Sequence, residues 1–179
     1  LGAYGDAGGI ITNDNFLAKK FRMFANHGAL TKHEHQIEGI NSRMDGIQAA
    51  ILNVKLNFIK EWTEKRREIA NYYSKHLKDI SSIKIPKVRY KTKHAFHLYV
   101  IRVKNRNSLM AFLKKNNIDC AIHYPKALPN LDCYKNLTDE DDYKIASRNQ
   151  QEILSLPIYA ELKKSQLDFI IKKIKEFYI

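Results

Sequence analysis

The sequence of 179 residues contains two cysteines, four prolines and no long apolar run. Cys120 and Cys133 form no Cys-x-x-Cys pair and no dense cysteine framework of the secreted kind, so two free thiols in a reducing cytoplasm are expected. The longest apolar stretches, such as Ile170-Ile171, fall far short of the roughly 18 residues that a spanning helix needs. We therefore expect a cytoplasmic protein without a membrane span.

The beginning of the sequence lacks an initiator methionine, a basic leader and an apolar leader segment. Leu1 opens directly into a glycine-rich stretch that continues to Gly9. We expect on this ground that the sequence starts inside a longer protein.

Acidic residues are few relative to basic ones. Asp and Glu number 19 against 31 Lys and Arg, which gives a formal net charge of +12. Such a charge favours a polyanionic partner, but the basic residues are spread along expected helix faces and no nucleic-acid-binding motif is present. We expect no nucleic-acid partner. A basic, non-enzymatic binding module remains the alternative, which the salt dependence of DNA binding would distinguish.

The histidines and acidic residues that could bind a metal ion lack further ligands at suitable spacing. The pairs His33-x-His35 and His94-x-x-His97 have no carboxylates or thiolates at matching spacing. The acidic run from Asp139 to Asp142 lacks the spaced oxygen donors and the glycine of a calcium loop. The sequence therefore predicts no metal site.

Apolar periodicity predicts the elements of the first half. A short strand is expected at 10–12, followed by a helix that Asn13 or Asp14 caps and Gly28 ends, and then a loop over 29–40. The strongest signal is an apolar stripe from Met44 to Ile80, which predicts one helix of roughly 50 Å at about 1.5 Å per residue. A helix of that length exceeds one small domain, so we expect it to connect two domains or to follow a subunit interface.

The pattern after Pro86 is that of an α+β domain. We expect strands at 95–103 and 118–124, helices at 109–115 and 143–153, and an extended segment at 156–159. The spacing Ser165-x-x-Asp168 predicts a capping box at the start of a last helix.

The segment from Gly39 to Arg43 stands directly before the expected long helix. The first turn of a helix has unpaired N–H groups and a positive dipole end, so an Asn41 amide and an Arg43 guanidinium placed there could hold a phosphate. From these residues alone, an ordinary cap by Asn41 or Ser42 with Arg43 in solvent is the simpler interpretation.

His123 and Tyr124 stand where an expected strand ends and a loop begins, and such positions commonly present active-site side chains. A partly exposed histidine without a chemical role is again the simpler interpretation of these residues alone. Composition and spacing thus lead to an α/β fragment with two polar clusters.

Longer motifs carry more information. They occur in the order found in the DegT or StrS type of nucleotide-sugar aminotransferase, which the sequence resembles along nearly its whole length. These motifs are the segments Leu1 to Asp14, Asn26-His27-Gly28, Gly39 to Leu52, His123-Tyr124-Pro125 and Leu156-Pro157-Ile158-Tyr159.

The resemblance implies an α/β fold, namely the C-terminal part of a pyridoxal-phosphate-dependent transferase of fold type I with a long connecting helix. Residues 1–43 would be a remnant of the large cofactor-binding domain, 44–80 the connecting helix and 81–179 a small C-terminal α/β domain. The implied enzyme is a homodimer that transfers an amino group from glutamate to a keto-sugar nucleotide for polysaccharide or glycan synthesis.

The resemblance also implies roles for four residues. Asn41 would reach the cofactor phosphate of the other subunit, with Arg43 beside it toward the substrate, and His123 and Tyr124 would contact the sugar nucleotide. The Schiff-base lysine would lie upstream of Leu1, so the chain alone is expected to be inactive. A partner chain that completes another subunit's site is a further possibility. The loop after Pro125 departs from the family pattern, so the family's contacts from this loop are not carried over to it.

Overall fold

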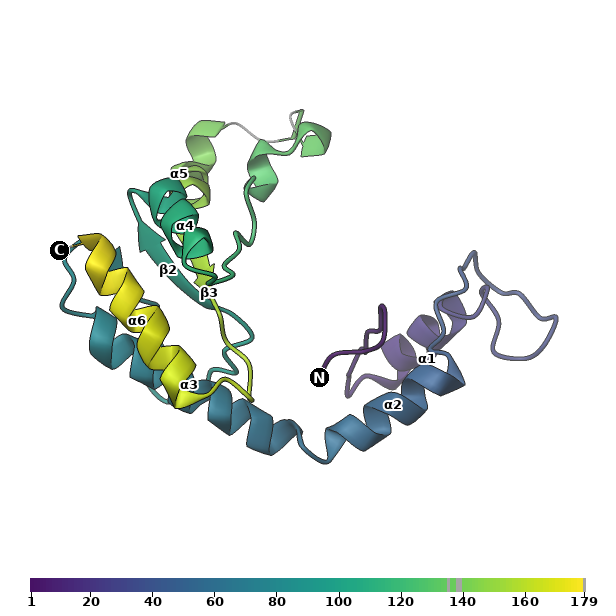
Figure 1. Cartoon of the computed structure of the whole chain (residues 1–179). Coiled ribbons are helices and arrows are strands. Elements are labelled where there is room, and N and C mark those ends of the chain that lie inside the picture. The colour runs from purple at the N-terminus through teal and green to yellow at the C-terminus, as the bar shows by residue number, and fades with distance from the viewer. Residues whose placement is uncertain (135, 138–139, 179) are drawn as a thin grey trace. The chain divides into compact units, whose positions relative to one another are not determined.

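The computed structural model describes residues 1–134, 136–137 and 140–178, without the side chains of 140 and 141. The chain divides into two compact units, Leu1–Ile59 and Lys60–Ile179 (Figure 1). Each unit is described by itself. Among the described residues, no helix has the length and apolar character needed to cross a membrane.

The first unit contains α1 (Asn15–Phe24) and α2 (Gly46–Leu56). The Asp14 carboxylate caps α1, as the sequence predicts, by accepting hydrogen bonds from the N–H groups of Phe16 at 2.8 Å and Leu17 at 3.0 Å. The expected strand at 10–12 is wrong. Ile11 is 99% exposed, and no strand of the described chain pairs with this segment.

Gly28 ends the turn after α1, also as predicted. Its φ of +82° lies in the left-handed region, and its N–H donates to the Met23 carbonyl at 2.7 Å. A Cβ at Gly28 would come within 1.7 Å of the Ile37 carbonyl oxygen, so the returning loop packs directly on this glycine. The loop expected over 29–40 is confirmed as irregular chain.

The single helix expected from Met44 to Ile80 is wrong, because α2 ends at Leu56 and α3 spans Ile59–Leu77. Between them the Asn57 amide donates to the carbonyls of Asn53 at 3.4 Å and Val54 at 3.3 Å, a local bond that competes with helix continuation. Apolar residues continue the stripe across the interruption, so periodicity could not reveal it. The division between the two units falls at this point.

The second unit is built on a three-stranded antiparallel sheet with the order β1-β2-β3. Its strands are β1 (Ile83–Lys84), β2 (Tyr99–Val103) and β3 (Ile153–Leu156). The strand expected at 95–103 starts late because Phe96 has a φ of +46°, which extended chain does not adopt. The strand expected at 118–124 is reduced to one bridge, Ala121 with Ser155.

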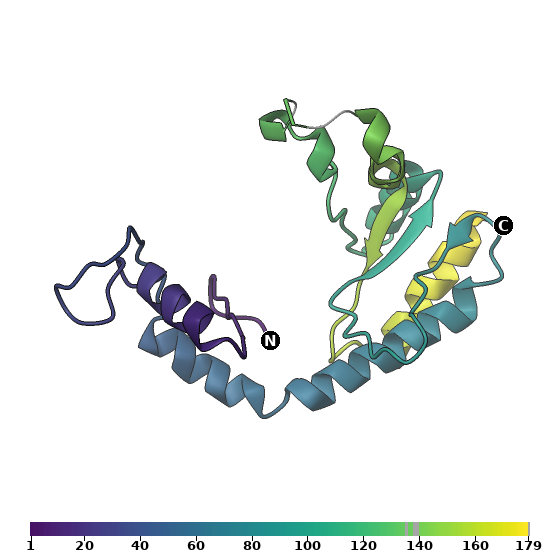
Figure 2. The ribbon, with the colours of Figure 1, turned by 180° about the vertical axis from the view of Figure 1, so that it is seen from behind.

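Three helices and short 3₁₀ turns complete the second unit. The helices are α4 (Arg106–Lys115), α5 (Lys144–Glu152) and α6 (Lys164–Tyr178). The turns are Leu128–Asn130, Asp132–Tyr134 and Glu140–Tyr143. In the views of both Figure 1 and Figure 2, α6 runs beside α3, and α4 contacts both α6 and β3.

The core of this unit lies between the sheet and these helices. Tyr73 of α3 stacks on Tyr99 of β2 with ring centroids 5.0 Å apart, and both are fully buried. Burial raises the pKa of both phenols, which therefore stay protonated. Tyr73 donates to the Pro157 carbonyl at 2.9 Å. The largest fully buried aliphatic residues are Leu77, Ile101, Val103, Leu109, Leu113, Leu154 and Ile174.

Arg66 fastens α3 to two distant parts of the chain. Its guanidinium donates to the carbonyls of Ile158 at 2.8 Å, His97 at 3.3 Å and Phe96 at 3.4 Å. One cation thus satisfies three carbonyls that precede β2 or follow β3, where the chain leaves the sheet.

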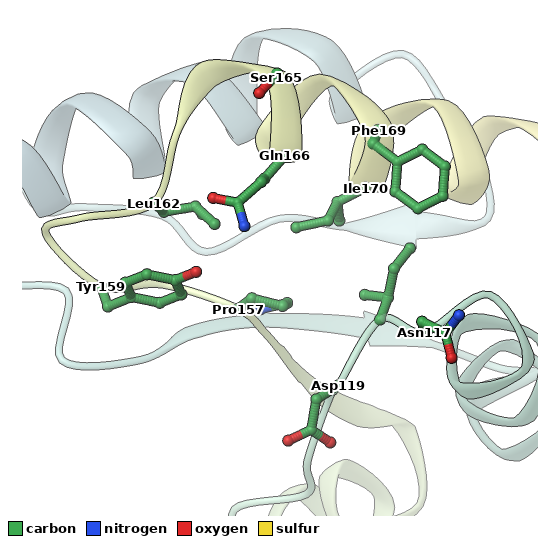
Figure 3. Close-up of a pocket in the computed structure, with 10 residues that line it drawn as sticks. Asn117, Asp119, Pro157, Tyr159, Leu162, Ser165, Gln166, Phe169 and Ile170 are labelled. Carbon is green, nitrogen blue, oxygen red and sulfur yellow. The ribbon is translucent and has the colours of Figure 1, made fainter.

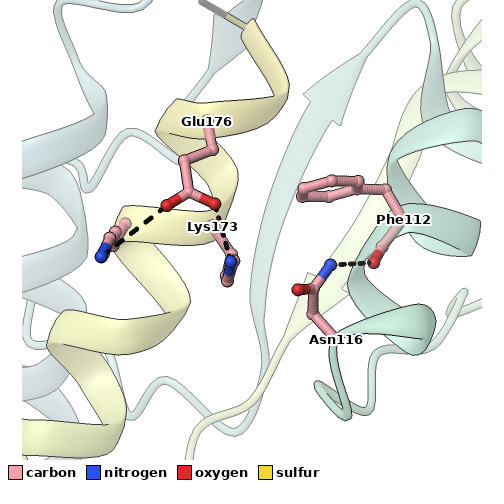
Figure 4. A network of polar contacts seen from close by, with 5 residues as sticks. Phe112, Asn116, Lys173 and Glu176 are labelled. Atoms are coloured by element: carbon pink, nitrogen blue, oxygen red, sulfur yellow. Dashed lines mark hydrogen bonds and ion pairs between the residues drawn. The ribbon is translucent and has the colours of Figure 1, made fainter.

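The capping box predicted from Ser165 and Asp168 is wrong, because α6 already begins at Lys164. The N–H of Lys163 donates to the Gln166 side chain at 3.0 Å, and Asp168 instead accepts from the Tyr72 hydroxyl at 2.6 Å. Farther along α6, Glu176 pairs with Lys173 at 2.7 Å, and in Figure 4 this pair lies opposite the end of α4.

Candidate functional site

Asn41 and Arg43 lie together in the first unit. The Arg43 Nε donates to the Asn41 Oδ1 at 3.1 Å, and the other end of the guanidinium donates to the Asn26 Oδ1 at 3.4 Å. Asn26 and Asn41 face each other in an isolated antiparallel bridge, and the Asn26 amide donates to the Ala29 carbonyl at 2.9 Å. The turn after α1 therefore places both predicted residues against a third polar side chain.

This arrangement leaves donors for an anion. Because the Asn41 oxygen already accepts from Arg43, the NH₂ group of this exposed amide is the part left to donate, and the exposed guanidinium has further N–H groups. A neutral donor beside a fixed cation fits a phosphate monoester such as that of pyridoxal phosphate.

The expected position of this pair at a helix start is wrong. α2 begins at Gly46 after Asp45, so neither Asn41 nor Ser42 is its N-cap residue. The Asp45 side chain makes no capping hydrogen bond either. The helix dipole acts within about one turn, so binding capacity here rests on the amide and the guanidinium themselves.

His123 and Tyr124 lie together in the second unit, directly after the Ala121 bridge. Their rings meet edge to face, with centroids 5.6 Å apart and an interplanar angle of 78°. The His123 Nδ1 lies 2.8 Å from the hydroxyl of Ser155 on β3, while Tyr124 is 72% exposed. One ring is thus held by the sheet and the other faces outward.

An apolar hollow of about 530 Å³ opens beside Tyr124. Its lining comes from the loop after Tyr124 and from α5, and includes Leu128, Leu131 and Ala146. Asn149 at its wall accepts a hydrogen bond from Arg102 at 2.6 Å, which ties α5 to the sheet. The hollow gives the His123–Tyr124 pair an apolar flank.

A second hollow, of about 610 Å³, lies between α6 and the segments that follow α4 and β3 (Figure 3). Gln166 reaches from α6 toward Pro157 and Tyr159, and Phe169 stands at one side. None of the four predicted site residues lines this hollow.

Both cysteines lie outside these pairs. Cys120 is buried and Cys133 exposed, and both are free, as predicted. Burial raises the pKa of the Cys120 thiol, which makes it a poor nucleophile. The described residues contain no group of three or more potential ligands that could hold a metal ion. Asp139, the first residue of the acidic run, lies outside the described residues.

A model of the DegT/DnrJ/EryC1/StrS aminotransferase family matches residues 1–175. The chain belongs to this family. Aminotransferases of the DegT/DnrJ/EryC1/StrS family use pyridoxal phosphate.

Individual curated proteins are similar to nearly the whole of this chain. The chain is 41% identical to a pleiotropic regulatory protein of Geobacillus stearothermophilus, covering 99% of this chain and 49% of that protein. It is 36% identical to the dTDP-3-amino-3,6-dideoxy-alpha-D-galactopyranose transaminase of Aneurinibacillus thermoaerophilus, covering 95% and 46%.

The fold is that of solved family members. S. venezuelae DesV, crystallised in complex with a ketimine intermediate, superposes with a TM-score of 0.94 at 30% identity over 99% of this chain and 48% of DesV. The chain therefore spans about half the length of the relatives it matches. This agrees with the predicted resemblance to the C-terminal half of such an enzyme.

Two polar residues of these clusters escaped sequence reasoning. Asn26 belongs to the Asn26-His27-Gly28 motif, but its contact with Arg43 forms only because the chain returns through the loop. Ser155 stands in the apolar run Ile153–Leu156, and a lone hydroxyl in a buried strand was the available signal.

Proposed function

We propose that this chain supplies the C-terminal part of a pyridoxal-phosphate-dependent aminotransferase that acts on a keto-sugar nucleotide, with glutamate as the amino donor. The observation that carries the proposal is the family match over residues 1–175 combined with two polar pairs suited to phosphate and sugar oxygens. The product would be an amino sugar for glycan synthesis, the class of reaction named for the Aneurinibacillus relative being transamination of a dTDP-linked sugar.

Residues 1–43 would form part of a larger cofactor-binding domain. The first unit buries few side chains, among them Met23 and Ala29, while large apolar residues of α1 and α2 stay exposed. Phe16 is 63% exposed and Ile47 77%. These surfaces suit the polypeptide that makes up the other half of the relatives' length. We call this chain together with that polypeptide the assembled enzyme.

Bound pyridoxal phosphate supplies the electron sink that lets an amino group pass between two carbonyl carbons. The residues of this chain would hold its phosphate through the Asn41 amide, with Arg43 oriented by Asn41 and Asn26 toward substrate oxygens. No lysine of this chain is assigned a covalent role.

His123 and Tyr124 would bind the sugar nucleotide. An imidazole and a phenol offer donors to sugar hydroxyl and phosphate oxygens, and the exposed Tyr124 ring offers an apolar face. In a homodimer, each pair would approach the cofactor of the neighbouring subunit.

The proposal is tested with pyridoxal phosphate and borohydride, which fixes a lysine adduct covalently. The chain alone should show no adduct on a unique lysine and no turnover, since none of its lysines is assigned to the cofactor. The assembled enzyme should form the adduct on a lysine of the other half and convert glutamate and a dTDP-linked keto-sugar. A unique adduct with turnover in this chain alone would overturn the assignment.

A non-catalytic role as a partner chain, or as a basic binding module, is the second candidate. It is favoured by the half-length coverage, the net charge of +12 and the name of the Geobacillus relative. Binding to generic DNA that weakens steeply with salt, without any gain of turnover in the assembled enzyme, would support the basic module.

A further inference from the structure

Ser155 is a buried strand residue beside the His123–Tyr124 pair. It lies in β3 with 4% of its surface exposed, paired with Val100 of β2 on one side. On the other side its N–H donates to the Ala121 carbonyl at 2.8 Å, and its own carbonyl accepts from the Ala121 N–H at 3.3 Å. Neighbours on both sides therefore fix the backbone of Ser155.

The hydroxyl of Ser155 lies 2.8 Å from the His123 Nδ1, which is the one hydrogen-bond partner the described chain gives it. A buried hydroxyl whose proton has no acceptor costs free energy, whereas an unused lone pair costs little. The arrangement that satisfies the hydroxyl is donation from Ser155 to an unprotonated Nδ1. The ring proton of the neutral imidazole then resides on Nε2.

We propose that Ser155 is a positioning residue for His123: its buried hydroxyl holds the imidazole in one orientation with Nε2–H as the outward donor. The proposal rests on the proposed function, in which His123 binds the sugar nucleotide. It assigns the acceptor as well, because an Nε2–H group binds an oxygen with a free lone pair, such as a phosphate or hydroxyl oxygen of the nucleotide sugar.

Orientation matters here because His123 follows the last pairing of its segment with the sheet at Ala121. Beyond it, the Tyr124 ring lies edge to face with the imidazole and is itself exposed. A loop histidine without the Ser155 bond would sample several rotamers, and each binding event would have to select one of them. Because the Ser155 hydroxyl belongs to a rigid strand, it holds the imidazole in one rotamer before the ligand binds.

The experiment records the ¹⁵N spectrum of the histidine side chains of the full 179-residue chain in mildly alkaline buffer, where imidazole is neutral. His123→Asn removes one set of signals and so assigns His123 among the seven histidines. The expected spectrum shows an unprotonated Nδ1 that accepts a hydrogen bond. In Ser155→Ala this resonance should move to the position of a free acceptor, with ring couplings averaged over rotamers.

Two further variants keep the test decisive. Ser155→Thr retains the hydroxyl in a strand-favouring side chain and should restore the wild-type resonance. Ser155→Cys has nearly the same volume and a much weaker donor, and it replaces the alanine variant if that variant loses the native amide spectrum. A protonated Nδ1 in the wild type, or an unchanged Nδ1 resonance in both Ser155→Ala and Ser155→Cys, would overturn the proposal.

Binding of dTDP to the assembled enzyme, measured by calorimetry, separates this proposal from the proposed function. Ser155→Ala should weaken dTDP binding about fivefold, the worth of one neutral hydrogen bond, and Ser155→Thr should restore it. A changed Nδ1 resonance with unchanged dTDP affinity would leave the positioning role in place and remove His123 from the nucleotide site. An unchanged resonance removes the positioning role whatever the affinity does.

Discussion

The two units differ in how far each encloses its own apolar residues. The second unit surrounds a sheet with helices and buries residues from its three strands and from α3, α4 and α6, among them Tyr73, Tyr99 and Ile174. The first unit has helices of similar apolar content, yet α2 buries no residue and α1 buries Met23 alone. A unit of that length has little surface to bury even when well packed. The second unit is stabilised by its own core, whereas the first requires a covering surface.

A matched pair of leucine substitutions tests most strongly whether the two units differ in this way. Leu109→Ala empties a fully buried site in the second unit and should lower the free energy of unfolding by about 2–5 kcal/mol. Leu56→Ala in α2, where the side chain is 56% exposed, should change it by less than about 0.5 kcal/mol. Urea unfolding of the chain followed by circular dichroism measures both. Equal losses would show that the first unit has a core of its own.

The polar pair of the first unit should contribute to the affinity of the assembled enzyme for its cofactor. In the assembled enzyme, Asn41→Ala removes a donor from the proposed phosphate site and should weaken pyridoxal phosphate binding by about 1–3 kcal/mol. Equilibrium dialysis against graded cofactor concentrations measures the change. Ser42→Ala, one residue farther along the exposed segment, is the control and should leave retention as it is. Unchanged retention in Asn41→Ala would refute the phosphate role.

The polar pair of the second unit should act on the sugar nucleotide instead. His123→Ala or Tyr124→Phe in the assembled enzyme should raise the KM for the nucleotide sugar about fivefold while the glutamate half-reaction proceeds nearly as before. Cofactor absorbance follows each half-reaction separately. An equal loss in both halves would assign the pair a structural or catalytic role.

The smallest expected effect belongs to the surface of α6. The hydrogen bond from Lys173 lowers the pKa of Glu176, so the carboxylate stabilises the fold above its unfolded-state pKa and ceases to do so as the pH falls through the folded value. The urea midpoint of the wild type should therefore be slightly higher than that of Glu176→Gln at pH 7, and this difference should shrink as the pH falls and the Glu176 carboxylate is protonated. A difference that grows toward acid pH would contradict this sign.

Sequence reasoning was most successful where a residue acts on its neighbours. Asp14 caps α1 and Gly28 turns the chain after it, because both effects depend on local backbone geometry. It was less successful where contacts between distant segments of the chain determine the structure. The Asn57 interruption left the apolar stripe intact, and the strand at 118–124 lost all but one pairing. The residues of the two polar pairs were predicted from family motifs, whereas their hydrogen-bond partners Asn26 and Ser155 are brought to them only by the fold.

The contacts of Arg66 also limit when the second unit can fold during synthesis of the chain. Its partners are carbonyls 30, 31 and 92 positions farther along the chain, so α3 leaves the ribosome long before Ile158 exists. The same holds for the core, to which β3 and α6 contribute Leu154, Leu156 and Ile174. A nascent chain stalled before β3 would lack the core residues of β3 and α6, and such partly exposed apolar surface favours aggregation. Translation must therefore pass α6 before the core of this unit is complete.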